Sequence, residues 1–343
     1  MKRLIALLMA GLTIAALAGC QKQEASTQMF AMDTVMGLTA YGGGAEKAVK
    51  AAEEEIVRLE KLLSRTDAES VVSRLNEAGG MPVEIDEEVA SLLKAAGAYS
   101  QATDGAFDIT IAPVVSAWGF TTDSYQVPEQ AELEGLLEAV GMEHVILADG
   151  QAVLEHGARI DLGGIAKGYA SDKVGEIFEA HQVESGMVAL GGNILVMGTK
   201  PDGTPWRVAV QDPARPNEAA DAAILQLADA FAVTSGSYQR YFEQDGTLYH
   251  HILDPETGYP ADSGLTSVTV VTDRASGSGT MCDARSTAVF VMGEEQALAF
   301  WRSGAYPFEL VVVTEDGRVV VRAGLEDALV KTEESGYTYE IVS

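Results

Sequence analysis

The chain has 343 residues, of which 47% are hydrophobic and 22% are charged, a composition typical of a globular protein and not of a disordered one. Its formal net charge of −28 argues against a nucleic-acid-binding function, because that affinity is built on Lys and Arg contacts to phosphates. An anionic ligand would therefore need local cations or a metal ion to be held by this protein.

The N-terminus is typical of an exported lipoprotein. After a basic start, an apolar run over residues 4–17 is too short for a stable membrane span, and two small residues then directly precede Cys20. We expect a lipoprotein signal peptide over residues 1–19, a lipid anchor on Cys20 and a polar tether over residues 20–28. This would place the protein on the extracytoplasmic side of a membrane, in the periplasm or at the cell surface. The alternative is a plain signal peptide followed by an incidental cysteine.

The first half of the chain mixes helical and strand patterns. In Ala45–Leu63, small and apolar residues recur every three or four positions, which predicts one buried helix face. Asp149 and Gly150 separate two short apolar runs, which is a strong hairpin signal. The predicted elements are a strand over Phe30–Tyr41, helices over Ala45–Leu63, Asp86–Thr103 and Pro128–Val140, and a hairpin of His144–Ala148 with Gln151–Glu155.

The second half is richer in short apolar strands. The predicted elements are a helix over Ile165–His181, strands over Met187–Leu190, Ile194–Met197, Trp206–Val210, Ala222–Leu227, Ala230–Val233 and Thr266–Val271, a loop and helix over Ser278–Met292, and a hairpin of Phe308–Thr314 with Arg318–Arg322. Because helices and antiparallel hairpins are mixed and no linker divides the chain, we expect an α+β fold. It would be a single merged globular body over residues 29–343, with mixed, largely antiparallel sheets and flanking helices.

The stretch Asp161–Ala170 is a candidate anion site. Gly163 and Gly164 form a turn before a predicted helix, and glycines there allow a bulky anion to approach the backbone. Lys167, one turn inside the helix, would supply a point charge for phosphate. The stretch matches neither the Walker loop nor the dinucleotide fingerprint, so taken alone it favours an ordinary strand–turn–helix.

Two adjacent histidines precede a tight turn. Adjacent residues on a strand point to opposite faces, so at most one of His250 and His251 faces a shared pocket. A histidine titrates near neutral pH and is therefore a candidate general base, while a core histidine bonded to the backbone is the equal alternative.

A candidate cation site follows near the C-terminal end. Asp283 and Thr287 are four residues apart on a predicted helix and therefore share a face, where their oxygens could meet on one Mg²⁺. A helix N-cap plus a buried threonine is the alternative for this pair. The hydroxyl-rich turn Thr234–Tyr238 lacks the spacing of a nucleophilic serine and suits a ligand-contacting or structural turn better.

Taken together and in this order, these motifs resemble the ApbE family, the FAD:protein FMN transferases. The motifs that carry the resemblance are Met32–Thr34, Ser70–Asn76, Gly105–Asp108, Asp161–Lys167, Gly191–Asn193, Thr234–Gly236, His251–Pro255 and Asp283–Thr287. Each is modest alone, but the ordered set covers nearly the whole mature chain.

The resemblance implies a lipid-anchored enzyme that transfers FMN from FAD to a Thr or Ser hydroxyl of a target flavoprotein, depends on Mg²⁺ and releases AMP. It implies that FAD is bound by Met32, Ala106, Phe107, Asp108, Asp161, Lys167 and Ile252. It further implies that Asp283, Thr287 and the carbonyl of Gly164 hold the metal, and that His251 is the base for the acceptor hydroxyl.

Two residues depart from the family pattern. Asp33 stands where a glycine is usual, and Arg285 lies inside the metal motif, where we expect it to point to solvent. Two other functions use the same residues: a Mg²⁺-dependent FAD pyrophosphatase with water as the acceptor, and a lipoprotein that binds FAD without chemistry. A generic solute-binding lipoprotein would have two domains with a hinge, and no hinge is visible.

Overall fold

The computed structural model describes residues 23–122, 124–304, 306–332 and 335–343. The predicted signal peptide and Cys20 lie outside these residues. Within them, no helix combines the length and the apolar character that a membrane crossing requires.

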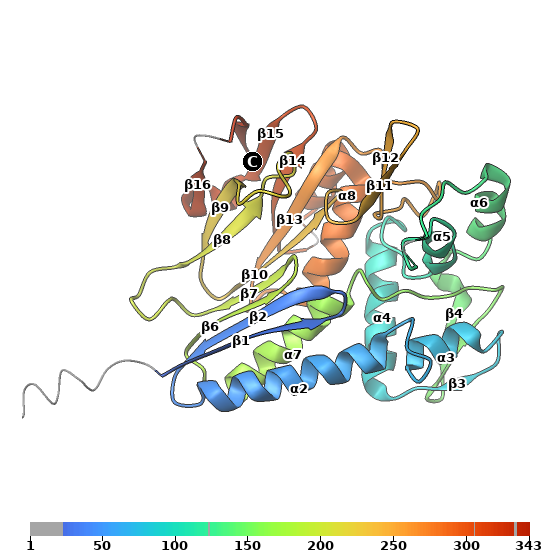
Figure 1. Cartoon of the computed structure of the whole chain (residues 1–343), viewed down its shortest axis with the longest axis horizontal. Helices are drawn as coiled ribbons and strands as arrows, with labels where there is room; N and C mark the ends of the chain where they lie inside the picture. Colours follow the sequence, from blue (N-terminus) through green and yellow to red (C-terminus); the bar gives the residue numbers. More distant parts are fainter. Residues whose placement is uncertain (1–22, 123, 305, 333–334) are drawn as a thin grey trace, which may run out of the picture.

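A large mixed sheet forms the centre of the molecule (Figure 1). In the described part of the chain it has nine strands in the order β1-β2-β6-β7-β10-β13-β14-β15-β17, and all neighbours are antiparallel except β15 and β17. The strands are β1 (Glu24–Ala31), β2 (Thr34–Tyr41), β6 (Ser185–Leu190), β7 (Asn193–Met197), β10 (Ala230–Gly236), β13 (Leu265–Asp273), β14 (Glu309–Thr314), β15 (Arg318–Arg322) and β17 (Thr338–Val342). The predicted α+β class with largely antiparallel sheets is confirmed.

Three smaller sheets surround this one in the described residues. They are β3 (Val83–Glu84) with β5 (Gln151–Leu154) and β4 (Val145–Ala148); β16 (Leu329–Lys331) with β9 (Asp221–Leu227) and β8 (Trp206–Gln211); and the ribbon of β11 (Tyr241–Gln244) with β12 (Thr247–His250).

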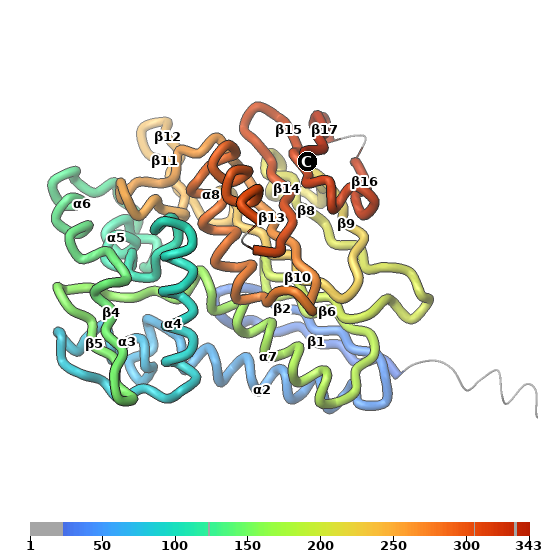
Figure 2. Tube along the Cα trace, turned by 180° about the vertical axis from the view of Figure 1, so that it is seen from behind, coloured from blue at the N-terminus to red at the C-terminus, as the bar shows by residue number. Residues whose placement is uncertain are grey.

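Helices cover one face of the large sheet, as the view from behind shows (Figure 2). The three long helices on this face are α2 (Ala45–Leu63), α7 (Ala166–Ala180) and α8 (Gly279–Arg302). The remaining helical segments are α3 (Val71–Glu77), α4 (Glu87–Ala102), α5 (Ala112–Ala117), α6 (Gln130–Leu137), η1 (Met142–His144) and η2 (Ala323–Ala328). Segments α3 to α6 and the β3–β5–β4 sheet lie together at one end of the molecule (Figure 1).

Two hydrophobic cores lie on the two faces of the large sheet. Successive side chains of a strand point to opposite faces, and in β14 Leu310 and Val312 enter the core against the helices, while Val311 and Val313 enter the core against β8 and β9. Both faces of this strand are buried, which is why its sequence is apolar without a break.

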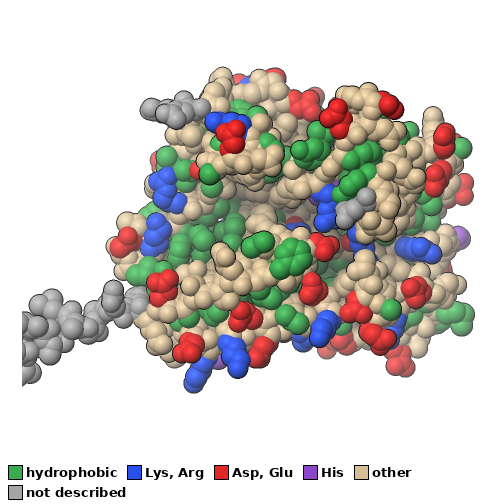
Figure 3. All heavy atoms as spheres, viewed as in Figure 1, with side chains coloured by type: hydrophobic (Ala, Val, Ile, Leu, Met, Phe, Trp, Pro, Cys, Tyr) green, Lys and Arg blue, Asp and Glu red, His purple; other side chains and the backbone are tan. Residues whose placement is uncertain are grey.

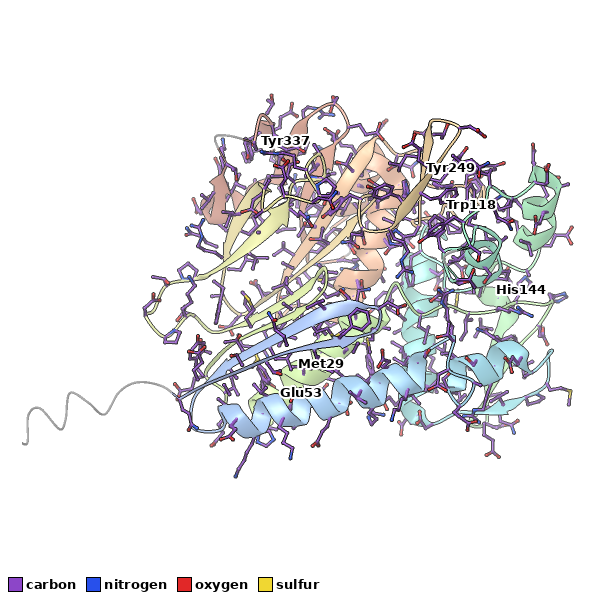
Figure 4. The ribbon with its side chains drawn as sticks, in the orientation of Figure 1. Met29, Glu53, Trp118, His144, Tyr249 and Tyr337 are labelled. Carbon is purple, nitrogen blue, oxygen red and sulfur yellow. The ribbon has the colours of Figure 1, made fainter. Side chains whose placement is uncertain are left out.

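A third, aromatic core fills the space beneath the β11–β12 ribbon. Trp118 is fully buried, and its ring centroid lies 5.3 Å from that of Tyr249 on β12 (Figure 4). The indole N–H donates a 2.7 Å hydrogen bond to the carbonyl of Gly258, which fixes the ring under the ribbon.

The N-terminal prediction is wrong in two respects. Phe30–Tyr41 is not one strand, because the chain turns at Met32 and Asp33, whose φ angles of 48° and 59° are those of a tight hairpin turn. Residues Glu24–Gln28 were expected in a flexible tether, yet they form the first part of β1 and pair with residues 37–41 of β2.

Most other predicted elements agree with the structure within a few residues. The helix expected to end at Met292 does end there as a regular helix, and beyond a kink at Gly293 a second helical segment of α8 continues to Arg302. Gly293 has φ 74° and ψ 173°, a non-helical conformation that L side chains rarely adopt, so the kink falls at a glycine.

Candidate active site

A cleft of about 880 Å³ opens on the face that Figure 3 shows, as a hollow in the middle of the molecule. The β1–β2 turn, the β6–β7 turn and the N-terminal ends of α7 and α8 meet around it. Every predicted site residue in the described part of the chain lines it: Met32, Ala106, Phe107, Asp108, Asp161, Gly164, Lys167, His251, Ile252, Asp283 and Thr287. These residues therefore converge on one place, although they are spread over about 250 positions.

The position of Asp283 is set by a close crossing of α7 and α8. A Cβ added to Gly168 on α7 would lie 2.3 Å from the carbonyl oxygen of Gly279 on α8, so the two backbones meet where neither residue has a side chain. At this crossing the backbone N–H of Gly168 donates a 2.9 Å hydrogen bond to Oδ2 of Asp283.

A carboxylate on α7, that of Asp172, stabilises the first turn of α8. Asp172 accepts hydrogen bonds from the backbone N–H groups of Gly279 (2.6 Å) and Thr280 (3.0 Å), as an acid at a helix N-terminus should. Burial raises the pKa of Asp172 above its ordinary value, and its bonds to Thr280 and Gly279 oppose this. The N-cap of α8 is Ser278, so the alternative in which Asp283 is an N-cap is wrong.

Asp283, Thr287 and Gly164 all line the cleft, and Gly164 lies beside Thr287. A Cβ added to Gly164 would lie 3.7 Å from Oγ1 of Thr287 and 3.0 Å from the ring of Phe107, so the backbone of Gly164 lies close to the threonine hydroxyl. Thr287 Oγ1 is also 3.4 Å from Oγ of Ser235.

The chemistry of these residues fits a magnesium ion whose remaining ligands are phosphate oxygens and water. The side-chain amide of Asn193 donates a 3.3 Å hydrogen bond to Oδ1 of Asp283. The amide oxygen of Asn193 is buried and has no hydrogen-bond partner among the described residues. No group of three or more His, Cys, Asp or Glu side chains converges within the described residues. Mg²⁺ is commonly held in this way, by one or two carboxylates together with phosphate oxygens and water.

Two cations, Arg65 and Lys167, lie near the N-terminal end of α7. The Arg65 guanidinium lies 3.3 Å from the carboxylate of Asp161, which also accepts a 2.8 Å bond from the N–H of Gly163. Lys167 reaches back over the turn, with Nζ 3.2 Å from the carbonyl of Gly163. These side chains supply the local positive charge that an anionic ligand needs in so acidic a protein.

The Ser70–Asn76 motif acts from outside the cleft. Asn76 makes a reciprocal pair of hydrogen bonds with the backbone of Ile160, donating to its carbonyl (2.9 Å) and accepting from its N–H (2.7 Å). The side chain therefore fixes the backbone directly before Asp161 and does the work that a neighbouring strand would do.

The main contacts of the Asp108 side chain are within its own loop and not with the open part of the cleft. Its carboxylate accepts bonds from the N–H (2.8 Å) and hydroxyl (2.6 Å) of Thr110 and is buried. Burial raises the pKa of Asp108, although the bonds from Thr110 act in the opposite direction. The loop it holds presents Ala106 and Phe107 to the cleft.

The two histidines diverge, as their adjacency on the chain predicts. His251 lines the cleft, and its Nδ1 lies 3.1 Å from the carbonyl of Arg240. Because a carbonyl only accepts, Nδ1 carries the proton and the Nε2 lone pair is free. His250 is buried on the other side, with Nε2 3.3 Å from the carbonyl of Ala261 and its ring against Phe290.

His251 is kept neutral by its surroundings. Loss of water around the ring lowers its pKa to about 3, and the positive charges of Arg240 and Lys167 act in the same direction. A neutral imidazole without a proton on Nε2 is the form that can accept one, although so low a pKa makes the ring a weaker base than an exposed histidine.

The β6–β7 turn completes the cleft wall. A Cβ added to Gly191, whose φ is 65°, would meet Oγ1 of Thr34 at 2.9 Å, and one added to Gly192 would meet the carbonyl of Thr234 at 2.5 Å. Only glycines allow this turn to pack between β2 and β10. Met32 opposite is fixed by a 2.7 Å bond from its N–H to Glu60.

With this geometry, the comparison with known proteins is decisive. The model of the ApbE family matches residues 32–310. The chain belongs to the ApbE family.

Individual ApbE proteins are similar along most of the chain. The FAD:protein FMN transferase of Treponema pallidum (strain Nichols) is 32% identical over 327 residues, which cover 89% of this chain and 88% of that protein. The FAD:protein FMN transferase of Vibrio cholerae serotype O1 is 33% identical, with 88% of this chain and 92% of that protein covered. Among solved structures, the ApbE protein of Thermotoga maritima has a TM-score of 0.79 at 34% identity, covering 91% of this chain and 97% of its own.

The prediction for Arg285, one of the two residues that depart from the ApbE pattern, is wrong. Arg285 does not point to solvent: it is 3% exposed, and its guanidinium carbon lies 4.2 Å from the ring centroid of Tyr306 and 5.1 Å from that of Phe308. Two positions along a helix is more than half a turn, so Arg285 lies on the opposite side of α8 from Asp283. It therefore does not compete with a metal ion, and burial lowers its pKa below the ordinary value.

Several cleft residues of this ApbE protein were not singled out by the sequence reasoning. They include Arg65, Asn193, Gln239, Arg240 and Tyr241. Arg65 and Asn193 lie in or beside recognised motifs, and that position in the sequence could have identified them. Arg240 and Tyr241 come between two motifs, and only the fold places them at the cleft.

Proposed function

We propose that this protein is an enzyme that transfers FMN from FAD to a hydroxyl group of a target protein. The observation that carries the proposal is the convergence of an oxygen-donor set, local cations and a neutral histidine in one cleft. Family membership supports it, because the relatives named FAD:protein FMN transferase are matched over about nine-tenths of their length.

Asp283, Thr287 and the carbonyl of Gly164 would hold a magnesium ion. When bound, Mg²⁺ supplies Lewis-acid polarisation of a phosphoryl oxygen and neutralises charge on the departing phosphate. The role of the chain is to fix these donors before the substrate arrives. The bonds from Gly168 and Asn193 orient the Asp283 carboxylate, and such partners of ligands commonly matter about 10- to 100-fold.

The remaining cleft residues bind the nucleotide. Lys167 and Arg65 attract the diphosphate, and the positive end of the α7 dipole adds to this attraction. Met32, Phe107 and Ile252 offer apolar contacts of the kind that a flavin ring requires.

His251 is the general base for the acceptor. Its Nε2 takes the proton of a Thr or Ser hydroxyl, and that oxygen bonds to the phosphorus of the FMN half of FAD. The bond from this phosphorus to the bridging oxygen breaks, and the bridging oxygen leaves with AMP. A serine or threonine hydroxyl is a weak nucleophile at neutral pH, which is why a positioned base is needed.

The test is intact-protein mass spectrometry of an apo-acceptor flavoprotein after incubation with the enzyme, FAD and MgCl₂. We expect the acceptor to gain the mass of FMN less one water, with one AMP released per acceptor. Release of FMN and AMP without any change in the acceptor mass would show a pyrophosphatase instead. Binding of FAD without release of AMP would show a storage protein.

We further propose that the enzyme is tethered to a membrane on the extracytoplasmic side through lipidated Cys20. The support is the sequence alone, since this residue lies outside the described part of the chain. Replacing Cys20 with Ala should release the protein from the membrane fraction or leave the signal uncut. An unchanged membrane fraction together with an unchanged mass would overturn the proposal.

A further inference from the structure

Two exposed apolar pairs flank the mouth of the cleft. Phe30 and Val35 are directly paired on the β1–β2 hairpin, one step from its turn, and are 71% and 64% exposed. Tyr241 and Leu248 lie on the β11–β12 ribbon and are 42% and 51% exposed. These four residues are called the mouth surface below.

Both hairpins belong to the cleft and approach each other there. Asp33 at the β1–β2 turn lies 4.0 Å from the guanidinium of Arg240, the residue directly before β11. Asp33, Arg240 and Tyr241 all line the cleft. Figure 3 shows hydrophobic side chains over the β1–β2 hairpin beside the hollow.

The ribbon has a buried face and an open face. Phe242 and Tyr249 are paired and stacked, with ring centroids 5.3 Å apart, and they pack on the aromatic core around Trp118. Tyr241 and Leu248 lie on the other face as diagonal neighbours, which brings their side chains within reach of each other. The apolar surface thus continues from the cleft outward along the ribbon.

Exposing each of these apolar side chains to water is unfavourable. Because they are grouped at one opening, we expect them to contact a partner. Scattered single apolar residues on a surface need no explanation, but a group at the rim of a site marks an interaction surface. Tyr241 lines the cleft together with His251, so the open face of the ribbon reaches the site through Tyr241.

We propose that the mouth surface is the docking site of the acceptor flavoprotein, which lays an apolar patch beside its Thr or Ser on it. This rests on the proposed function, because the acceptor hydroxyl must reach His251 through this mouth. The four side chains then position a macromolecular substrate and leave the chemistry to the cleft.

A membrane is the less suitable occupant. The chain enters the described structure at the far end of β1, and the eight residues of that strand span about 26 Å at about 3.3 Å each. A lipid anchor before Glu24 would therefore hold the opposite end of the hairpin to the bilayer. The mouth surface lies at the turn end, where it is open to a protein partner.

The test measures acceptor binding separately from transfer. The probe is an apo-acceptor flavoprotein whose acceptor Thr or Ser is changed to Val or Ala, so it can bind but cannot react. Its Kd is measured by biolayer interferometry against the wild-type enzyme, the double variant Phe30→Ser/Val35→Ser and the variant Leu248→Ser. None of these three residues lines the cleft, so FAD affinity and thermal melting check that the fold is intact.

We expect Kd to rise at least about tenfold in each mouth variant, the size of effect seen for a central interface residue. The matched controls are Met81→Ser and Ile146→Ser, which remove exposed apolar side chains of 67% and 41% exposure on or beside the β3–β5–β4 sheet. They should leave Kd within about twofold.

Unchanged Kd in the mouth variants, an equal rise in the controls, or no binding by the wild type would overturn the docking site. If the mouth variants keep their affinity for the acceptor and instead lose binding to phospholipid vesicles, the docking site would also be overturned and the mouth surface would be a membrane-binding surface. Failure of the proposed function has a different signature: the unblocked acceptor gains no FMN although the blocked one binds.

Discussion

The backbone N–H of Gly168 and the carboxylate of Asp283 are joined by a 2.9 Å hydrogen bond across the closest approach of α7 and α8. One residue thus connects helix packing to ligand geometry. Any change that separates the two helices also moves the carboxylate that we propose as a metal ligand.

Gly168→Ala should weaken both the fold and the metal site. The new Cβ would lie 2.3 Å from the carbonyl oxygen of Gly279 and 2.8 Å from Cβ of Asp283, so the helices must separate. We expect the free energy of unfolding in urea to fall by about 1–3 kcal/mol and the Mg²⁺ concentration for half-maximal transfer to rise. The control is Gly135→Ala on α6, where no atom lies within 4 Å of the added Cβ. Equal behaviour of the two variants would contradict the role of the crossing.

Asp283→Asn should abolish Mg²⁺-dependent transfer while the protein stays folded. The amide keeps the shape of the side chain and can still accept from Gly168, but it lacks the charge that holds a divalent ion. We expect transfer at a fixed Mg²⁺ concentration to fall at least about 100-fold, since metal catalysis contributes several kcal/mol. Isothermal titration with MgCl₂ alone gives an independent readout. Full transfer by this variant in the presence of a chelator would rule out the site.

His251→Ala and His250→Ala should have different consequences. If His251 is the base, as we propose, its loss should slow transfer by about 10²–10⁴-fold at saturating FAD, with FAD affinity little changed. His250 is buried against Phe290, so its removal leaves a cavity and should lower the melting temperature while transfer stays close to wild type. Rates and melting curves of both variants decide this. A comparable loss of rate in both would mean that the base is assigned wrongly.

His251 should remain neutral far into the acid range. Its pKa in the folded protein is about 3, below the ordinary value of 6.5, so the unfolded chain binds more protons between these values. The stability that this provides is fully present above about pH 6.5 and is lost as the pH falls toward 3. In NMR titrations of the free enzyme, the His251 ring signals should not move between pH 8 and pH 5, roughly two pH units above its pKa. His251→Gln should flatten the acid side of the stability curve. A midpoint near 6.5 would contradict the desolvated site.

Arg285→Met should leave transfer and its Mg²⁺ dependence unchanged. Methionine keeps the apolar stem over Tyr306 and Phe308, and it removes a buried charge whose Nη1 has no partner among the described residues. Relief of desolvation and loss of the cation–π contact act in opposite directions, so unfolding free energy should change by less than about 1 kcal/mol. A shift in the Mg²⁺ response would show that Arg285 acts on the metal after all.

The sequence specified local elements better than their arrangement. Periodicity was sufficient for α2, because its apolar stripe at Ala48, Ala52, Ile56 and Leu59 is regular and fully buried. It failed at the first hairpin, because Met32 and Asp33 take positive φ without the glycine or asparagine that normally marks such a turn.

The candidate site was predictable to the extent that its residues lie in motifs. The order of the motifs identified the cleft residues that lie within them. It did not identify Arg240, because the position of Arg240 at the cleft depends on the fold of the β11–β12 ribbon that follows it. Arg285 was misjudged for the same reason: the rings that bury it lie some twenty positions further along the chain, beyond the reach of any local pattern.

The hydrogen bonds that finish the cleft connect distant positions. Their sequence separations are 84 for Asn76 with Ile160, 90 for Asn193 with Asp283, 107 for Asp172 with Gly279 and 115 for Gly168 with Asp283. Closing such long loops is slow and costs chain entropy before any contact rewards it. We therefore expect the cleft to be completed late in folding, because each of these contacts requires distant parts of the chain to be in place already.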